Sequence, residues 1–275
     1  MESATSTLAS APCTSPHPPI RLRIGQYRLH FEAVDAVRLP EYSGSTWRGA
    51  LGHALKRTVC VTREPVCAEC LLYTSCAYAY VFETPPPPGS GKMRLYPAAP
   101  HPFVIEPAEG GARDLACGDA LALGVALFGH ANRYLPYVIH AMRRAGEEGV
   151  GKGKGRLNLL AVHQLGEGAE DDWRPIHEAG GPLTALPPAV PEMPAAPGAV
   201  SLELHTPLRL QRDGHNVGPD DLRFADLFSN LLRRLSMLTY FHTDTPLEAD
   251  FAGLTAEART VERTERAPTW RDWTR

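Results

Sequence analysis

Hydrophobic periodicity predicts the first two elements of the chain. Residues 21–31, RLRIGQYRLHF, alternate polar and apolar side chains, which is typical of a strand with one buried face. A helix follows, because Ser45 or Thr46 can cap it and apolar residues then recur at helical spacing. The core stripe predicted for this helix is Trp47, Leu51 and Leu55.

The alternation of strands and helices continues to residue 162. Residues 101–107, HPFVIEP, predict a short strand, and residues 118–144 carry apolar side chains at mostly helical spacing, which predicts a helix. A glycine-rich loop leads into residues 157–162, LNLLAV, which predict another strand. This order indicates an α+β fold, and we expect a ferredoxin-like unit over residues 20–177.

A change of composition separates this unit from a second one. Residues 178–199 are rich in proline and small side chains, which predicts a linker. Beyond it, residues 200–210 alternate as a strand, residues 220–241 form an amphipathic helix, and residues 260–266 predict a last strand. We therefore expect a second unit over residues 200–275.

Composition limits the classes of protein to which this chain can belong. The formal net charge of -3 argues against a protein that coats nucleic acid with its whole surface, but it leaves room for local basic faces. No stretch approaches the roughly eighteen apolar residues of a membrane span, so we expect no membrane partner. Residues 1–19 lack the pattern of a signal or transit peptide and predict a disordered tail on a cytoplasmic protein.

The cysteines suggest a metal site. Four of the six cysteines fall within seventeen residues, CVTREPVCAECLLYTSC, and one pair has the Cys-x2-Cys spacing of two thiolates on one tetrahedral ion. We expect a closed structural zinc site; an iron–sulfur cluster, or free or partly oxidised thiols, are the alternatives. The predicted ligands are Cys60, Cys67, Cys70 and Cys76.

The loop before residue 157 bears on phosphate binding. Residues 146–152, GEEGVGK, fit the G-x-x-x-x-G-K core of a P-loop. A P-loop also needs Ser or Thr after its Lys and a following helix, whereas Gly153 follows Lys152 and a strand is predicted next. The loop therefore does not predict a nucleotide hydrolase. It is either a phosphate contact, made by free backbone N–H groups, or a flexible basic turn.

Several motifs, in a fixed order along the chain, resemble one known family. They are residues 39–55 (LPEYSGSTWRGALGHAL), the cysteine-rich loop that ends in residues 80–84 (YVFET), residues 101–103 (HPF), residues 149–156 (GVGKGKGR), residues 206–210 (TPLRL), residues 232–236 (LRRLS) and residues 270–275 (WRDWTR). Together they resemble CRISPR-associated precursor-crRNA processing endoribonucleases of the RAMP superfamily.

The resemblance implies two ferredoxin-like, RNA-recognition-motif-like modules in tandem. It also implies that residues 149–156 contact RNA phosphates or neighbouring subunits. The family continues past a segment like residues 270–275 with a helix, a glycine-rich loop and a closing strand, which this sequence lacks. We therefore expect an incomplete second module, in a truncated product, a fragment or one half of a split protein.

The same resemblance implies a metal-independent reaction, in which the 2'-hydroxyl of CRISPR repeat RNA attacks the adjacent phosphate. The reaction needs a base, an acid and a cation, and histidine suits the first two roles because its pKa is about 6.5. His53 is the first candidate, since the family often carries its catalytic histidine on this helix. Arg48 and Lys56 are candidates to stabilise the phosphate, and Tyr42 to orient or protonate.

Binding of the RNA is expected to depend on cations that neutralise phosphates. The predicted contacts are Gly151, Lys152, Gly153, Lys154, Arg156, Arg233 and Arg234. Two alternatives remain open. One is a RAMP subunit that holds crRNA in an effector complex with other subunits and does not cut it. The other is a zinc-stapled adaptor whose cysteine loop docks a protein.

Overall fold

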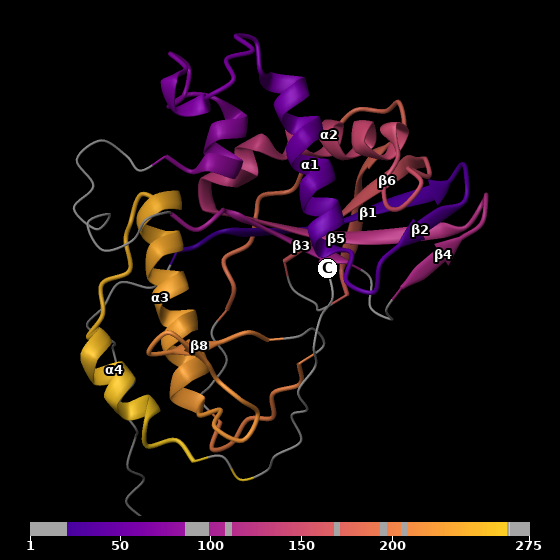
Figure 1. The fold of residues 1–275 in the computed structure, drawn as a ribbon. Helices are drawn as coiled ribbons and strands as arrows, with labels where there is room; N and C mark the ends of the chain where they lie inside the picture. The colour runs from indigo at the N-terminus through magenta and orange to yellow at the C-terminus, as the bar shows by residue number, and fades with distance from the viewer. Residues whose placement is uncertain are drawn as a thin grey trace, which may run out of the picture.

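One antiparallel sheet organises the protein. The computed structural model describes residues 21–85, 99–107, 112–167, 171–192, 197–204, 208–262 and 264. Its five-stranded sheet has the order β3 (Phe103–Pro107), β5 (Ala120–Phe128), β1 (Ile24–Ala33), β6 (Leu157–Leu165) and β7 (Trp173–Glu178). Two helices, α1 (Gly44–Val59) and α2 (Leu135–Glu148), lie on the same face of this sheet (Figure 1). The fold is α+β, as predicted.

The core lies between the sheet and these two helices. β1 is central because it pairs with β5 on one side and with β6 on the other. Its alternate residues Tyr27, Leu29 and Phe31 are only 1–2% exposed, which confirms the predicted strand with one buried face. Each such side chain contributes about 1.5–3 kcal/mol to folding. The α1 side chains of the core are the predicted Trp47, Leu51 and Leu55, together with Ala54.

The predicted helix over residues 118–144 is wrong in its first half, where the chain forms β5. Leu121, Leu123, Val125 and Leu127 are buried at a spacing of two, and the residues between them are alanine and glycine. Small side chains on the other face make such a strand almost uniformly apolar, so apolar residues also recur at helical spacing. The helix itself, α2, begins only at Leu135, after a 3-10 turn, η4 (Gly129–Tyr134).

The start of α1 also differs from the prediction. The helix begins at Gly44, so Ser45 and Thr46 lie inside its first turn and neither caps it. Ser43 occupies the N-cap position and its side chain makes no capping hydrogen bond. The one-turn shift leaves the buried stripe unchanged, because packing on the sheet sets it.

Residues 179–192 contain no regular helix or strand, but they are held against the sheet. The buried Gln164 of β6 donates from Nε2 to the Leu186 carbonyl at 3.0 Å and accepts from the Leu186 N–H at 2.9 Å. The Ile24 N–H donates to the Ala189 carbonyl at 2.7 Å. The segment predicted as a linker is therefore fixed to the sheet at least as far as residue 189.

The C-terminal part is mainly helical where it is described. The predicted helix over residues 220–241 is confirmed as α3 (Phe224–His242), and α4 (Phe251–Ala258) packs against it (Figure 1). The predicted strand over residues 200–210 is wrong for residues 200–204 and 208–210, where Val200, Leu202, Leu204 and Leu208 are exposed and Leu210 alone of these apolar residues is buried. Residues 260–262 and 264 form no strand either, and the rest of the last predicted strand lies outside the described residues.

Two short sheets complete the described structure. β2 (Val37–Leu39) pairs with β4 (Arg113–Leu115) beside the main sheet, and β8 (Gln211–Arg212) pairs with β9 (His215–Asn216) before α3. The β8–β9 hairpin is the sole sheet in the described residues after β7. A second sheet of the size expected for a complete module is thus absent from that part of the chain.

His242, the last residue of α3, joins the helix to the rest of the protein. Its side chain is 0% exposed, its Nδ1 lies 2.8 Å from the Tyr80 hydroxyl, and its Nε2 lies 2.9 Å from the Pro100 carbonyl. A carbonyl only accepts, so Nε2 carries the proton and Nδ1 accepts from Tyr80. Burial lowers the pKa of His242 to about 4, so the ring is neutral at pH 7.

Candidate functional site

The predicted catalytic residues on α1 fall into separate places. Arg48 and Lys56 lie along one side of the helix but are eight residues apart, which is about 12 Å along the axis. His53 lies between them in sequence, on a neighbouring side, and is exposed. Tyr42 precedes the helix and its side chain is 47% exposed. In this structure the Arg48 and Lys56 side chains contact different partners, so they do not line one site.

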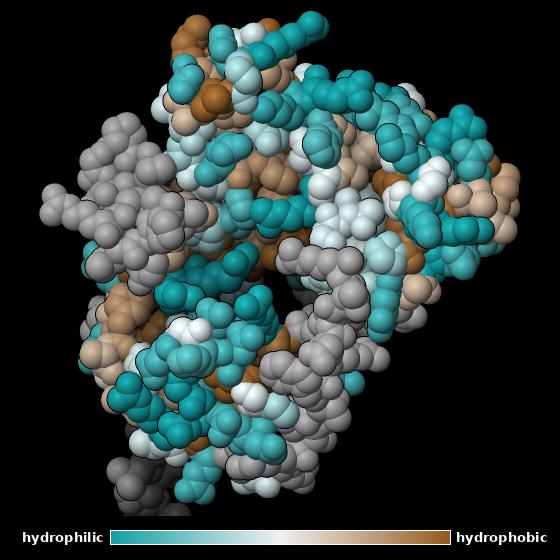
Figure 2. Space-filling model, viewed as in Figure 1, coloured by the Kyte–Doolittle hydropathy of each residue, from teal (hydrophilic) through white to brown (hydrophobic). Residues whose placement is uncertain are grey.

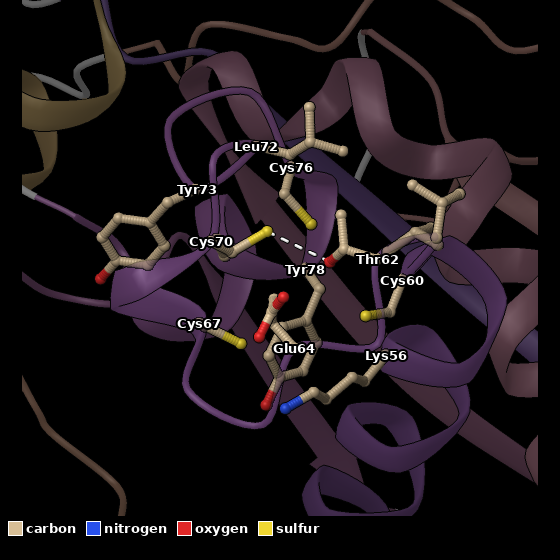
Figure 3. Close-up of a pocket in the computed structure, with 13 residues that line it drawn as sticks. Lys56, Cys60, Thr62, Glu64, Cys67, Cys70, Leu72, Tyr73, Cys76 and Tyr78 are labelled. Atoms are coloured by element: carbon tan, nitrogen blue, oxygen red, sulfur yellow. Dashed lines mark hydrogen bonds between the residues drawn. The ribbon is translucent and has the colours of Figure 1, made fainter.

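Lys56 belongs with the cysteine-rich loop. It lines one pocket together with all four predicted metal ligands, and Figure 3 shows its amine beneath the Tyr78 ring. The Lys56 Nζ lies 5.4 Å from the centroid of that ring. A hydrogen bond to Cys67 and the charge of the same thiol raise the pKa of Lys56. This lysine is therefore a cation beside thiols, at the far end of α1 from Arg48.

The structure gathers the four predicted metal ligands around this pocket. The pocket lies between the end of α1, the short turn η1 (Cys67–Glu69) and the π-helix η2 (Ala79–Glu83) (Figure 3). Four thiols are a donor set that suits zinc. Among the described residues, however, no three Cys, His, Asp or Glu side chains are close enough to hold an ion, and the Cys70 Sγ contacts the Thr62 Oγ1 at 3.2 Å. The types of the predicted ligands fit zinc, but their side chains line the pocket without meeting at a single point. These predicted ligands are Cys60, Cys67, Cys70 and Cys76.

Arg48 contacts a histidine that the sequence did not suggest. Its Nη2 lies 2.7 Å from the Nε2 of His101, just before β3. The rings of Phe82 and Phe103 flank this contact, with centroids 6.3 and 5.9 Å from that of His101. The two residues of the pair are 53 positions apart in the sequence, which carries no signal for their contact.

The Arg48 contact fixes the protonation state of His101. A guanidinium has no acceptor, so it donates to Nε2, and His101 is neutral with its proton on Nδ1. Nδ1 is buried and makes no hydrogen bond of good geometry, although the Val81 backbone is close enough to oppose the lowering of the pKa of His101. Because Nδ1 carries the proton, Nε2 holds the lone pair and is the reactive nitrogen. Burial, followed by the charge of Arg48, lowers the pKa of His101. The ring is therefore a neutral base at pH 7.

The glycine-rich loop, residues 149–156, is a tight turn packed on β2. Helix, loop and strand follow in the predicted order, from α2 into β6. The backbone N–H groups of Val150, Lys152 and Lys154 donate within the protein, to the carbonyls of Gly155, Arg38 and Gly151. The expectation that these N–H groups point outward toward phosphate is wrong for these three, because they are satisfied inside the fold.

The basic side chains of this loop differ in their surroundings. Lys152 and Lys154 are exposed, as is Gly153 between them. Arg156 is paired with Asp35, at 2.6 Å from Nε to Oδ2 and 3.1 Å from Nη2 to Oδ1. This bidentate pair lowers the pKa of Asp35 and occupies the guanidinium. The two lysines are thus the available cations of the loop.

The two predicted arginines of α3 also differ. Arg233 is exposed and its Nη2 donates to the Asn230 Oδ1 at 3.1 Å. Arg234 lies close enough to His101 for its charge to lower the pKa of that ring, and desolvation lowers its own pKa. The structure therefore brings Arg48 and His101 into contact, Arg234 acts on His101 through its charge, and Arg233 contacts its own helix.

The arrangement defines an α+β protein with a five-stranded antiparallel sheet, helices on one face and a cysteine-lined pocket at one end. Residues 22–188 match the family model AF_1859_N, described as an N-terminal domain. The match covers more than half of the chain, which therefore belongs to this family. The matched residues include the whole main sheet and end within the segment that Gln164 fixes.

A relative has a similar but longer sequence. An uncharacterized protein of Archaeoglobus fulgidus is 30% identical over 123 residues, which make up 45% of this chain and 39% of that protein. The aligned stretch thus spans about two fifths of the relative. None of the helices described here has the length and apolar character needed to cross a membrane.

Proposed function

We propose that this protein is an endoribonuclease that binds CRISPR repeat RNA and cleaves it without a metal ion to yield mature crRNA. The main support is the order of the main sheet. Without β7 the order is β6-β1-β5-β3, with α1 after β1 and α2 after β5. This is the arrangement of a ferredoxin-like βαββαβ unit, which many RNA-binding modules share. The motifs that resemble the RAMP superfamily also occur in a fixed order along the chain, most of them within this unit.

In this proposal, residues 20–177 form the first ferredoxin-like module and residues 200–275 a partial second one. Lys152 and Lys154 project from an exposed loop at the start of β6 and neutralise RNA phosphates. Arg233 and Arg234 add cations from α3. Other subunits of a CRISPR effector complex are further partners.

The 2'-hydroxyl of the RNA attacks the adjacent phosphate, leaving a 2',3'-cyclic phosphate and a free 5'-hydroxyl. His53 transfers a proton in this step, and Tyr42, two residues before α1, is an orienting group. Arg48 contacts the phosphate from the first half of α1. Lys56, about 12 Å further along the helix, serves an adjacent phosphate or the cysteine pocket.

We expect His53→Ala to slow repeat-RNA cleavage at least about a hundredfold while binding persists, because general acid–base catalysis contributes about 10² to 10⁴ in rate. The assay is gel-based cleavage of a labelled repeat RNA in EDTA, with affinity from fluorescence anisotropy. His215→Ala, at another exposed histidine in the β8–β9 hairpin, is the control and keeps its rate. An unchanged rate for His53→Ala would remove this residue from the mechanism.

Wild-type protein that binds repeat RNA but never cuts it would favour the crRNA-holding subunit. A specific observation supports the adaptor as a second candidate. The cysteine-rich loop exposes apolar side chains, with Val61 77% and Leu71 86% exposed, and Figure 2 shows hydrophobic residues at the top of the visible face, where this loop lies. RNA affinity that does not change with salt concentration would favour that adaptor.

The cysteine pocket is proposed to bind one structural zinc ion through its four thiolates. Bound zinc would staple the loop and leave no open coordination position, so it takes no part in RNA cleavage. We expect one zinc per chain by mass spectrometry, and loss of that zinc in Cys67→Ser. Cys117→Ser is the control, because Cys117 is an exposed free thiol outside the loop. Equal zinc content in both variants would place the metal elsewhere.

A further inference from the structure

The Arg48–His101 contact lies where four elements meet. Arg48 comes from α1, Phe82 from η2, His101 and Phe103 from the start of β3, and Arg234 from α3. The Arg48 guanidinium carbon lies 6.0 Å from the centroid of the Phe82 ring and 5.8 Å from that of Phe103. The aromatic rings form an apolar wall, so charges in this place are less screened than on an open surface.

Positive charges outnumber negative charges around the Arg48–His101 contact. Neither Arg48 nor Arg234 forms an ion pair with any carboxylate of the described residues. Glu83 is the carboxylate whose charge reaches His101, and it is exposed and acts more weakly than the two arginines. Two guanidinium groups around a neutral ring are suited to an anion, and a phosphate oxygen is a stronger acceptor for Arg48 than an uncharged imidazole.

We propose that Arg48, His101 and Arg234 form a pocket for one RNA phosphodiester, and that the Nε2 of His101 is the base that takes the 2'-hydroxyl proton. The proposal rests on the proposed RNA-cleaving function and adds to it a catalytic residue outside α1. In the free protein Arg48 covers Nε2 at 2.7 Å. A phosphate that binds Arg48 draws the guanidinium away and uncovers Nε2, so the base becomes available when RNA is present.

Each proton moved in this step passes between a histidine and an oxygen of the RNA. His101 Nε2 takes the proton of the 2'-hydroxyl, the 2'-oxygen forms a bond to phosphorus, and the bond from phosphorus to the 5'-oxygen breaks. The protonated His53 gives its proton to the departing 5'-oxygen. Arg48 and Arg234 stabilise the extra negative charge on the phosphate oxygens in the transition state. Solvent returns the two histidines to their starting forms.

Cleavage rates as a function of pH test the base. Wild-type cleavage is expected to rise with pH as His101 becomes neutral, and this is the rising limb of the profile. His101→Gln is expected to lower the rate about a hundredfold and to remove the rising limb. A retained rising limb in a folded His101→Gln would overturn the assignment, because a purely structural role lowers the rate without changing the profile.

Binding to a non-cleavable RNA tests the pocket independently of turnover. The probe is a 2'-O-methyl repeat oligonucleotide, added to the full chain with 15N-labelled histidine and followed by NMR. RNA binding is expected to shift the Nε2 resonance of His101 and to raise its pKa. Arg234→Gln reduces this response, and Arg259→Gln, at an exposed arginine at the end of α4, leaves it in place.

The outcomes separate the two proposals. RNA that binds without moving the His101 signal overturns the pocket alone. Absence of RNA binding overturns the proposed function, and the pocket with it. A response to inorganic phosphate as large as that to RNA marks a free-phosphate site and overturns the role in RNA cleavage.

Discussion

Lowering the pH from 7.5 to 4 is expected to destabilise the docked position of α3 by about 3 kcal/mol. The pKa of His242 is about 4 in the folded protein, whereas an exposed histidine has a pKa of about 6.5. Between these two pKa values the undocked state binds a proton and the docked state does not. The docked state therefore loses about 1.4 kcal/mol of stability for each unit by which the pH falls. The stabilisation is complete above pH 6.5 and is lost as the pH falls toward 4.

Hydrogen exchange of the α3 amides at several pH values measures this effect. His242→Gln is the informative variant, because glutamine does not titrate. It is expected to exchange faster than wild type at pH 7.5, since the contacts to Tyr80 and Pro100 are disturbed, and to lose the pH dependence. His215→Ala controls for an exposed histidine and keeps it. Equal protection of wild-type α3 at pH 7.5 and pH 4 would contradict the prediction.

Local periodicity determined which elements were predictable from the sequence. β1 and α1 each have one buried face with larger apolar residues and one polar face, so their periods of two and 3.6 are distinct. β5 was mistaken for helix because alanine and glycine on its second face removed the contrast. Residues 200–204 alternate as a strand does, yet they have no strand partner among the described residues.

The candidate site was predictable only where its residues are close in sequence. The four cysteines lie within one loop, and the structure brings them to one pocket. By contrast, the partners of Arg48 and Arg156 are 53 and 121 positions away, and a single sequence holds no record of such contacts. His101 was therefore not predicted as a site residue, and Arg156 was predicted to contact RNA although its guanidinium is paired with Asp35.

The packing of the glycine loop gives the second large expected effect, a loss of about 2–5 kcal/mol of folding stability in Gly151→Ala. Gly151 has a φ of +70°, and an added Cβ would lie 2.2 Å from the Arg38 carbonyl oxygen of β2. The left-handed backbone conformation costs an alanine about 1–2 kcal/mol. The overlap adds about 1–3 kcal/mol, because the loop must move off β2 and lose the hydrogen bond from the Lys152 N–H to Arg38.

Gly153→Ala separates these two costs. Gly153 also has a positive φ, of +88°, but an added Cβ would meet nothing within 4 Å, so the expected loss is only about 1–2 kcal/mol. Urea unfolding of both variants measures the difference, and equal losses would mean that β2 yields to the added methyl group. RNA affinity of the folded variants then distinguishes the roles of the two glycines. If the tip of the loop approaches phosphate, Gly153→Ala weakens binding despite its smaller effect on stability, because its methyl group stands between Lys152 and Lys154 on the exposed side.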